Sequence, residues 1–113
     1  MRNVEIAVRL APGTTPPRGT VTLRAQVEEI TAADAPAHVV SRTAERDVDL
    51  TAAPRLTLAV PRPDPRARYT VRVHADVDGS GAVAPEDYVS VRSNPVLTHG
   101  SPDSVAVEVT PVR

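Results

Sequence analysis

The chain has 113 residues, a length that gives room for one domain, and we expect residues 1–113 to fold as a single unit. It contains no Cys and no Lys, so disulfides, thiolate metal sites, cysteine nucleophiles and Schiff-base lysines are excluded. A formal net charge of -1 and an aromatic content of 2% argue against a nucleic-acid-binding protein, because such proteins are usually basic and stack bases on aromatic side chains.

Apolar residues alternate with polar ones along most of the chain, which is the pattern of half-buried β-strands. In chain order, the predicted strands lie at residues 4–10, 20–30, 39–43, 47–50, 56–60, 69–75, 88–92 and 105–109. Residues 11–18 and 61–65 are rich in proline and predict loops. Residues 31–37 favour one short turn of helix, which Pro36 limits because proline disfavours helical geometry in the residue before it.

The predicted strands follow one another at spacings of about 8–12 residues, which is typical of an all-β sandwich. The 12 prolines lie almost entirely between the strands, where they leave the hydrogen bonds of a sheet intact. Because Phe and Trp are absent, Val, Leu, Ile and Ala must fill the core. We therefore predict a single antiparallel β-sandwich of about seven to eight strands, with an Ig-like architecture.

The sequence contains no membrane span, because no stretch reaches the length of about 18 apolar residues that a spanning helix needs. Its first residues, MRNVEIAVRLAPG, lack the apolar region and the small-residue cleavage site of a secretory signal. If Met1 is the native start, we expect a cytoplasmic protein; otherwise we expect an exported one.

Residues 76–87 (DVDGSGAVAPED) have the spacing of a twelve-residue calcium loop, in which alternate residues around a tight glycine turn direct their oxygens at one ion. The predicted Ca²⁺ ligands are the side chains of Asp76, Asp78, Ser80 and Asp87 and the backbone carbonyl of Ala82. The loop resembles those of EF-hands and, more closely, dockerin modules, although its flanks predict strands in place of helices. The alternative is a plain hairpin turn with solvated acids, because Asp-Gly and Ser-Gly are common turn dipeptides.

The residues give no support for an enzyme, and we expect none. His38, His74 and His99 are too far apart in the sequence to show zinc-ligand spacing. His74 shares a strand face with Asp76, and we expect it to be an exposed histidine beside the charged loop. A triad of Ser90, His74 and Asp76 lacks the nucleophile elbow and oxyanion-hole signature that would support it.

Three motifs resemble the YbaY/YscW-type lipoprotein family. They are VEEITAADAPA at residues 27–37, PRARYTVRV at residues 65–73, and PVLTHG at residues 95–100 followed by the alternating residues 105–107. The resemblance covers about the last three quarters of the chain and implies a small, pilotin-like β-sandwich. The family includes pilotin-type lipoproteins that chaperone secretins of type III secretion systems. The lipobox and its Cys are absent, so no lipid anchor is expected.

Two hypotheses follow for the function. The first is a non-enzymatic β-sandwich that binds a protein or peptide partner through a sheet face or edge, with a Ca²⁺-binding hairpin loop at residues 76–87. The alternative is a pilotin-like chaperone that captures a partner peptide as an added strand or in a groove, with the loop acting only as a turn. Neither hypothesis includes nucleic acid as a partner.

Overall fold

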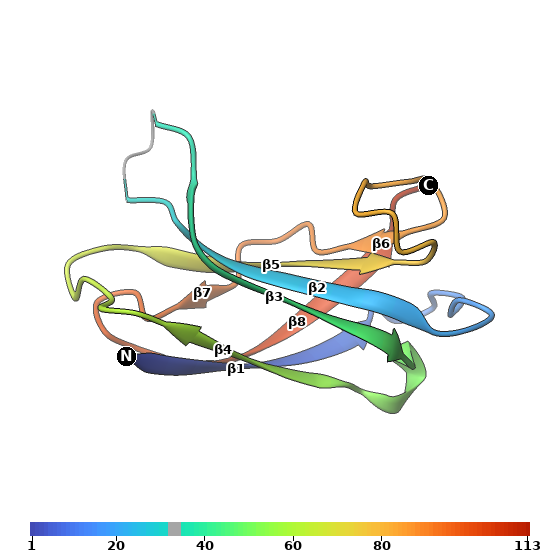
Figure 1. Cartoon of the computed structure of the whole chain (residues 1–113), viewed down its shortest axis with the longest axis horizontal. Helices are drawn as coiled ribbons and strands as arrows, with labels where there is room; N and C mark the ends of the chain where they lie inside the picture. Colours follow the sequence, from blue (N-terminus) through green and yellow to red (C-terminus); the bar gives the residue numbers. More distant parts are fainter. Residues whose placement is uncertain (32–34) are drawn as a thin grey trace.

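The computed structural model describes residues 1–31 and 35–113, which form eight strands and a short 3-10 helix (Figure 1). The strands are β1 (Arg2–Leu10), β2 (Val21–Glu29), β3 (His38–Val48), β4 (Arg55–Val60), β5 (Tyr69–Asp76), β6 (Tyr88–Val89), β7 (Pro95–Val96) and β8 (Ser104–Pro111). The 3-10 helix, Leu50–Ala52, links β3 to β4. Within the described residues, no helix has the length and apolar character to cross a membrane.

The strands form one sheet in the order β3-β2-β5-β6-β8-β1-β4, with β7 paired to β5 outside this path. All pairs are antiparallel except β1 with β8, which run in the same direction from the pair Glu5 and Ser104 to the pair Leu10 and Val109. The prediction of a purely antiparallel arrangement is therefore wrong. Alternation of apolar residues shows which face of a strand is buried, but it carries no information on the direction of its neighbour.

The all-β class is confirmed, but the sandwich of two separate sheets is not. Strand β8 pairs with β1 over most of its length and with β6 at Thr110 and Pro111, so the two layers visible in Figure 1 belong to one curved sheet. The outermost strands, β3 and β4, approach each other where the Ser41 hydroxyl donates to the Ala59 carbonyl at 2.7 Å. The sheet is therefore nearly closed and barrel-like.

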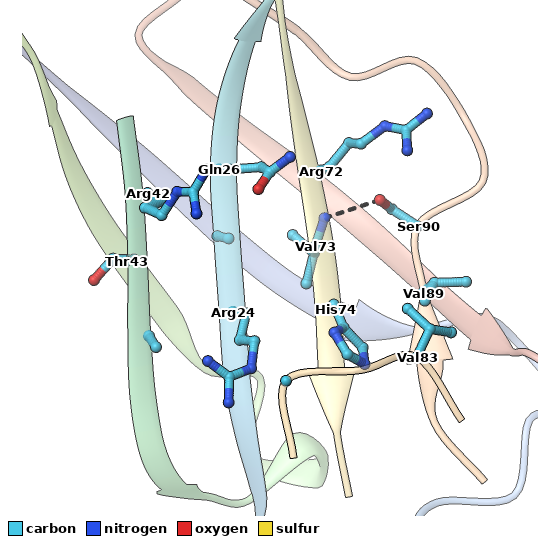
Figure 2. A pocket seen from close by; sticks show the side chains of 13 residues that line it. Arg24, Gln26, Arg42, Thr43, Arg72, Val73, His74, Val83, Val89 and Ser90 are labelled. Atoms are coloured by element: carbon cyan, nitrogen blue, oxygen red, sulfur yellow. Dashed lines mark hydrogen bonds between the residues drawn. The ribbon is translucent and has the colours of Figure 1, made fainter. Parts of the chain in front are cut away.

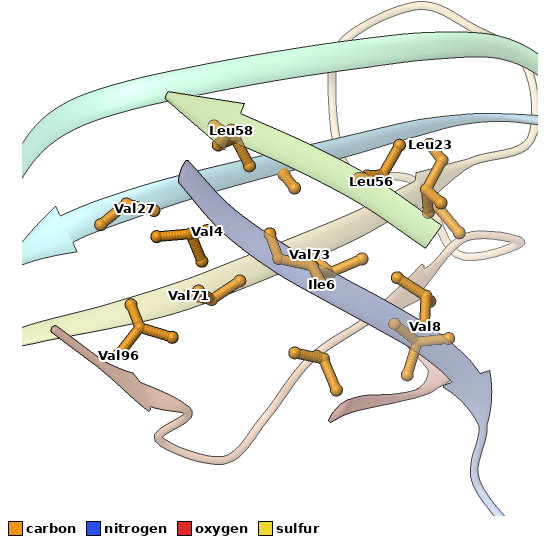
Figure 3. Close-up of a cluster of buried hydrophobic side chains, with 14 of the residues drawn as sticks. Val4, Ile6, Val8, Leu23, Val27, Leu56, Leu58, Val71, Val73 and Val96 are labelled. Atoms are coloured by element: carbon orange, nitrogen blue, oxygen red, sulfur yellow. The ribbon is translucent and has the colours of Figure 1, made fainter. Parts of the chain in front are cut away.

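The core lies between the layers and consists mainly of valine and leucine, as the composition predicts (Figure 3). Alternation appears most clearly in β1, where Val4, Ile6 and Val8 are buried. The apolar residues of β2, β4 and β5 face the same interior from the other strands. Burying such a side chain contributes about 1.5–3 kcal/mol, so this shared core is the main source of stability.

The structure differs from the predicted strands most clearly in the following places. The two short strands predicted at residues 39–43 and 47–50 are one long strand, β3 (His38–Val48), because β2 hydrogen-bonds to it even across the polar stretch that contains Ala44 and Glu45, and Leu50 belongs to the 3-10 helix. The predicted strand at residues 88–92 ends after Val89, because the Ser90 hydroxyl takes the place of a backbone acceptor for the Val73 N–H, at 2.9 Å. The short strand β7 was not predicted.

The helical turn expected at residues 31–37 includes residues 32–34, which lie outside the described residues. It stays a prediction.

Candidate functional site

The loop of residues 77–87 joins β5 to β6 and is bounded by two aspartates. Asp76 is the last residue of β5, and Asp87 directly precedes β6. Both side chains are 0% exposed, although most residues between them are exposed. Because an unpaired buried carboxylate is costly, each of them needs hydrogen-bond donors from its surroundings.

Asp76 receives its donors from the loop and from β2. Its Oδ1 accepts a hydrogen bond from the Gly79 N–H at 3.0 Å, and its Oδ2 accepts from the Gly81 N–H at 2.7 Å and from Nε of Arg24 at 3.1 Å. Both glycines have positive φ, +71° for Gly79 and +88° for Gly81, a backbone conformation that favours glycine. The glycines therefore allow the loop to fold back over the Asp76 carboxylate.

Asp87 is bonded in the same way at the other end of the loop. Its Oδ1 accepts from the Val77 N–H at 2.9 Å, and its Oδ2 accepts from the Ala84 N–H at 3.0 Å. Nε2 of His74 lies 2.7 Å from the same Oδ2. The prediction of an exposed His74 is wrong, because this contact leaves only 16% of its side chain exposed.

These contacts set the protonation of both acids. Burial raises the pKa of Asp76, but hydrogen bonding by the Gly81 N–H, by Asp78 and by Arg24 outweighs it, so this pKa lies below the ordinary aspartate value. Burial likewise raises the pKa of Asp87, but His74 and the backbone N–H groups of Val77 and Ala84 outweigh it, and this pKa is lowered too. Both carboxylates are therefore ionised at neutral pH.

Of the five predicted calcium ligands, the structure places Asp87 near both Asp76 and Asp78. Carboxylate oxygens of Asp76 and Asp87 lie within 4.8 Å of each other and of His74, and oxygens of Asp78 and Asp87 lie within 4.8 Å of each other and of Glu86. Among the described residues, the remaining two predicted ligands contact one another through the Ser80 hydroxyl and the Ala82 carbonyl, which are 3.4 Å apart.

The oxygen atoms of the predicted ligands fit a calcium ion only in part. A carboxylate has about four lone-pair positions, and the hydrogen bonds of Asp76 and Asp87 already use three of them on each residue. A cation would have to compete with these N–H donors for both buried acids. Calcium binding therefore stays a prediction, and the hydrogen bonds alone account for the folded loop.

A groove with a volume of about 560 Å³ crosses the outer face of β3, β2, β5 and β6 (Figure 2). Gly81 and Val83 belong to its lining, so the 77–87 loop contributes to its wall. The strands and Ser90, which directly follows β6, supply the other lining residues, whose side chains include Arg24, Gln26, Arg42, Thr43, Arg72, His74 and Val89. Because Asp76 accepts from the N–H of Gly81, the buried acid holds this wall in place.

A third buried acid, Glu28 on β2, holds side chains of the groove floor. Its Oε1 lies 3.4 Å from Nε of Arg72, and its Oε2 accepts a hydrogen bond from the amide of Gln26. The Glu28 side chain is only 8% exposed, whereas that of Arg72 is 71% exposed. The acid is therefore largely hidden, while the guanidinium that it orients faces solvent.

The sequence analysis did not single out this groove. Its arginines lie on three strands that are neighbours only in the folded sheet, since Gln26 is paired with Arg42 on one side and with Arg72 on the other. The sequence does show that Arg24, Gln26 and Arg72 occupy polar positions in strands whose polar and apolar residues alternate. That pattern identifies an outer face, but it does not reveal which strands share it.

These features define an all-β, barrel-like protein with a polar groove on one outer face. Among solved structures, this fold is similar to that described as an alternative pilotin from the type II secretion system of Vibrio cholerae, with a TM-score of 0.77. The alignment covers 99% of this chain and 97% of the other, at 16% sequence identity. A pilotin-like fold is therefore supported.

Comparisons at the level of sequence give no match, either to a protein-family model or to a curated protein.

Proposed function

We propose that this chain is a non-enzymatic, pilotin-like chaperone that binds a segment of a protein partner, with a secretin as the expected partner class. The observation that carries the proposal is the likeness of fold to a pilotin over 99% of the chain. The YbaY/YscW-type motifs at residues 27–37, 65–73 and 95–100 agree with the same assignment. Fold alone does not determine function, so the proposal also needs a surface that can hold a segment.

The groove over β3, β2, β5 and β6 is that surface. Its volume of about 560 Å³ is in the range of sites that hold ligands or side chains of a partner. Addition of a partner strand at a sheet edge is the other way to bind a peptide. The edge of β3 is less suitable, because Arg42, Glu45 and Arg46 are exposed on this strand and Ser41 bonds to β4. We therefore place the partner in the groove.

Binding to secretin segments tests the proposal. Overlapping segments that cover the secretin encoded in the same genome are purified, and their affinity for the full chain is measured by isothermal titration calorimetry. We expect one segment to bind with a Kd in the micromolar range or tighter, a free energy of about -8 kcal/mol. If no segment binds at concentrations of about 1 mM, the chaperone proposal is wrong.

The calcium prediction for residues 76–87 has its own experiment. The structural feature in its favour is the cluster of Asp78, Glu86 and Asp87 oxygens within 4.8 Å. Because N–H donors compete for Asp87, we expect weak binding, and an ion at about ten times its Kd stabilises the fold by about 1.4 kcal/mol. Three melting curves, one with 10 mM Ca²⁺, one with 10 mM Mg²⁺ and one with a chelator, measure this stabilisation. A concentration of 10 mM is about ten times a Kd of about 1 mM. Three identical curves would contradict the prediction.

A further inference from the structure

The floor of the groove presents arginine side chains from three neighbouring strands. The strand register places Arg42, Gln26 and Arg72 in one row across β3, β2 and β5. Arg24 and His74 form the next row, two residues along the same strands. Figure 2 shows Arg42, Arg24 and Arg72 around this floor, so the groove concentrates three guanidinium groups.

The acids that pair with two of these arginines offset part of their charge, but neither acid lines the groove. Glu28, the partner of Arg72, is 8% exposed, and Asp76, the partner of Arg24, is 0% exposed and also accepts two backbone N–H groups. Arg42 forms no ion pair within the part of the chain that the structure describes. Arg24 is 35% exposed, and its Nη2 also donates to the Gly79 carbonyl at 3.4 Å. Arg42 and Arg72 are exposed, so they offer most of the N–H donors that face solvent in the groove.

Two valines lie on the other side of the groove, beside His74 and Ser90. Val83, on the 77–87 loop, is 60% exposed, which is high for a valine held in an ordered wall. Val89 on β6 lies beside it in the lining (Figure 2). A ligand that suits both sides carries carboxylates for the arginines and an aliphatic group for the valines.

We infer that the groove binds an acidic segment of a partner protein, with carboxylates on Arg42, Arg72 and Arg24 and an aliphatic side chain against Val83 and Val89. The inference rests on the proposed function, because it specifies the chemistry of the segment that the chaperone holds. Arg pairs with carboxylates through two parallel hydrogen bonds, which gives geometric specificity as well as attraction. The mixed acidic and aliphatic character follows from the two sides of the groove.

A nucleic acid fits the groove less well, although it is also an anion. The groove has no Tyr, Phe or Trp in its lining on which a base would stack. The chain as a whole carries a formal charge of -1, so it lacks the broad positive field of a nucleic-acid-binding domain. A protein segment with a few carboxylates is therefore the better match.

The size of the groove defines a suitable probe. The groove crosses the four neighbouring strands β3, β2, β5 and β6. Because adjacent strands lie about 4.8 Å apart, the distance from β3 to β6 is about 14 Å, which about four extended residues cover. We would use a labelled twelve-residue peptide in which Glu alternates with Val or Leu, and a matched peptide with Gln in place of every Glu. Fluorescence anisotropy with the full chain measures both affinities, at low and at physiological salt. A single-stranded oligonucleotide of equal charge is the third probe.

Arg42→Glu is the decisive variant, and Arg46→Glu is its matched control. Both arginines are exposed on β3, but only Arg42 lines the groove. We expect the acidic peptide to bind at least tenfold more tightly than its Gln counterpart, and Arg42→Glu to weaken it at least tenfold while Arg46→Glu changes it less than threefold. Arg72→Gln provides a second test without charge reversal, and we expect a loss of at least threefold.

Three results would overturn the inference: no binding of the acidic peptide, equal losses from Arg42→Glu and Arg46→Glu, or tighter binding of the oligonucleotide. The secretin segments separate this inference from the proposed function. If a secretin segment binds and Arg42→Glu leaves its affinity unchanged, the groove assignment is wrong and the chaperone proposal survives. If the acidic peptide binds in the groove and no secretin segment does, the groove chemistry stands and the chaperone proposal is wrong.

Discussion

The outer face of β4, β1 and β8 and the outer face of β3, β2, β5 and β6 have the same alternating sequence pattern, yet they differ in depth and charge. The first has a hollow of about 270 Å³ and an ion pair between Arg9 and Glu108 at 3.2 Å, with both side chains partly exposed. The second has a groove of about 560 Å³ in which the partly exposed Arg24 and the exposed Arg72 pair with buried acids. Alternation produces a polar face in both cases, and buried acids in a folded-back loop turn one of these faces into a groove.

The largest expected effect comes from removing a buried acid. Asp76→Ala leaves Arg24 and the N–H groups of Gly79 and Gly81 without their acceptor, and we expect the free energy of unfolding to fall by about 3 kcal/mol. Urea denaturation measures it. Asp78→Ala removes an exposed acid of the same loop and should cost less than about 1 kcal/mol. Equal costs would mean that burial of Asp76 does not organise the loop.

The second prediction concerns the stability of the fold at low pH. The folded state lowers the pKa of Asp76 and Asp87, so their contribution is complete above the ordinary aspartate pKa and is lost as pH falls through the lowered values. We expect the melting temperature of the wild type to fall steeply below about pH 4. Asp87→Asn should be less stable at pH 7, and the difference from the wild type should shrink in acid.

Glu86→Gln is the control for this experiment, because it changes an exposed acid of the same loop. A difference between wild type and Asp87→Asn that stays constant from pH 7 to pH 2 would show that ionisation of Asp87 contributes nothing to folding.

A smaller effect is expected at the turn of the loop. Gly81→Ala meets no atom within 4 Å, so its cost comes only from the positive φ of +88°, and we expect about 1 kcal/mol. Gly19→Ala also meets no atom within 4 Å and has no such φ, so it should be nearly neutral. Thermal unfolding of the two variants gives the comparison. A neutral Gly81→Ala would show that the loop can change its path without loss.

The smallest expected effect is the coupling energy of the ion pair between Arg9 and Glu108, on the outer face of β4, β1 and β8. A double-mutant cycle on Arg9 and Glu108 should give a coupling energy of about 0.5 kcal/mol, as for other exposed ion pairs. The same cycle on Arg24 and Asp76 should give a larger value, because Asp76 is fully buried. Equal coupling energies would remove the electrostatic difference between the two outer faces.

Much of the fold was predictable from sequence, since burial has a period of two along β1, along most of β2 and along β4. The positions of Val4, Ile6 and Val8, for instance, define the buried face of β1 without further information. The parallel pairing of β1 with β8 was not predictable, because nothing local to either strand specifies its neighbour. The extent of β3 was missed for a related reason, since β2 supplies its hydrogen bonds.

The candidate site was predictable only as a location. The sequence indicated a loop between two strands at residues 77–87, and a loop joins β5 to β6 there, but its spacing of acids and glycines did not reveal that Asp76 bonds to Arg24, which lies 52 positions away. A carboxylate that binds a cation and one that accepts backbone N–H groups occur in the same turn motifs. The groove depends on the order of strands, which periodicity does not encode.

The parallel contact between β1 and β8 has a consequence for the timing of folding. Leu10 meets Val109 only after almost the whole chain has left the ribosome, and synthesis of about 100 residues takes about 5–20 s. During that interval one side of β1 has no neighbour, although β4 is already available on the other. Contacts of such long sequence separation also slow the search for the native state. The newborn polypeptide therefore leaves one edge of β1 without its neighbour for seconds during synthesis.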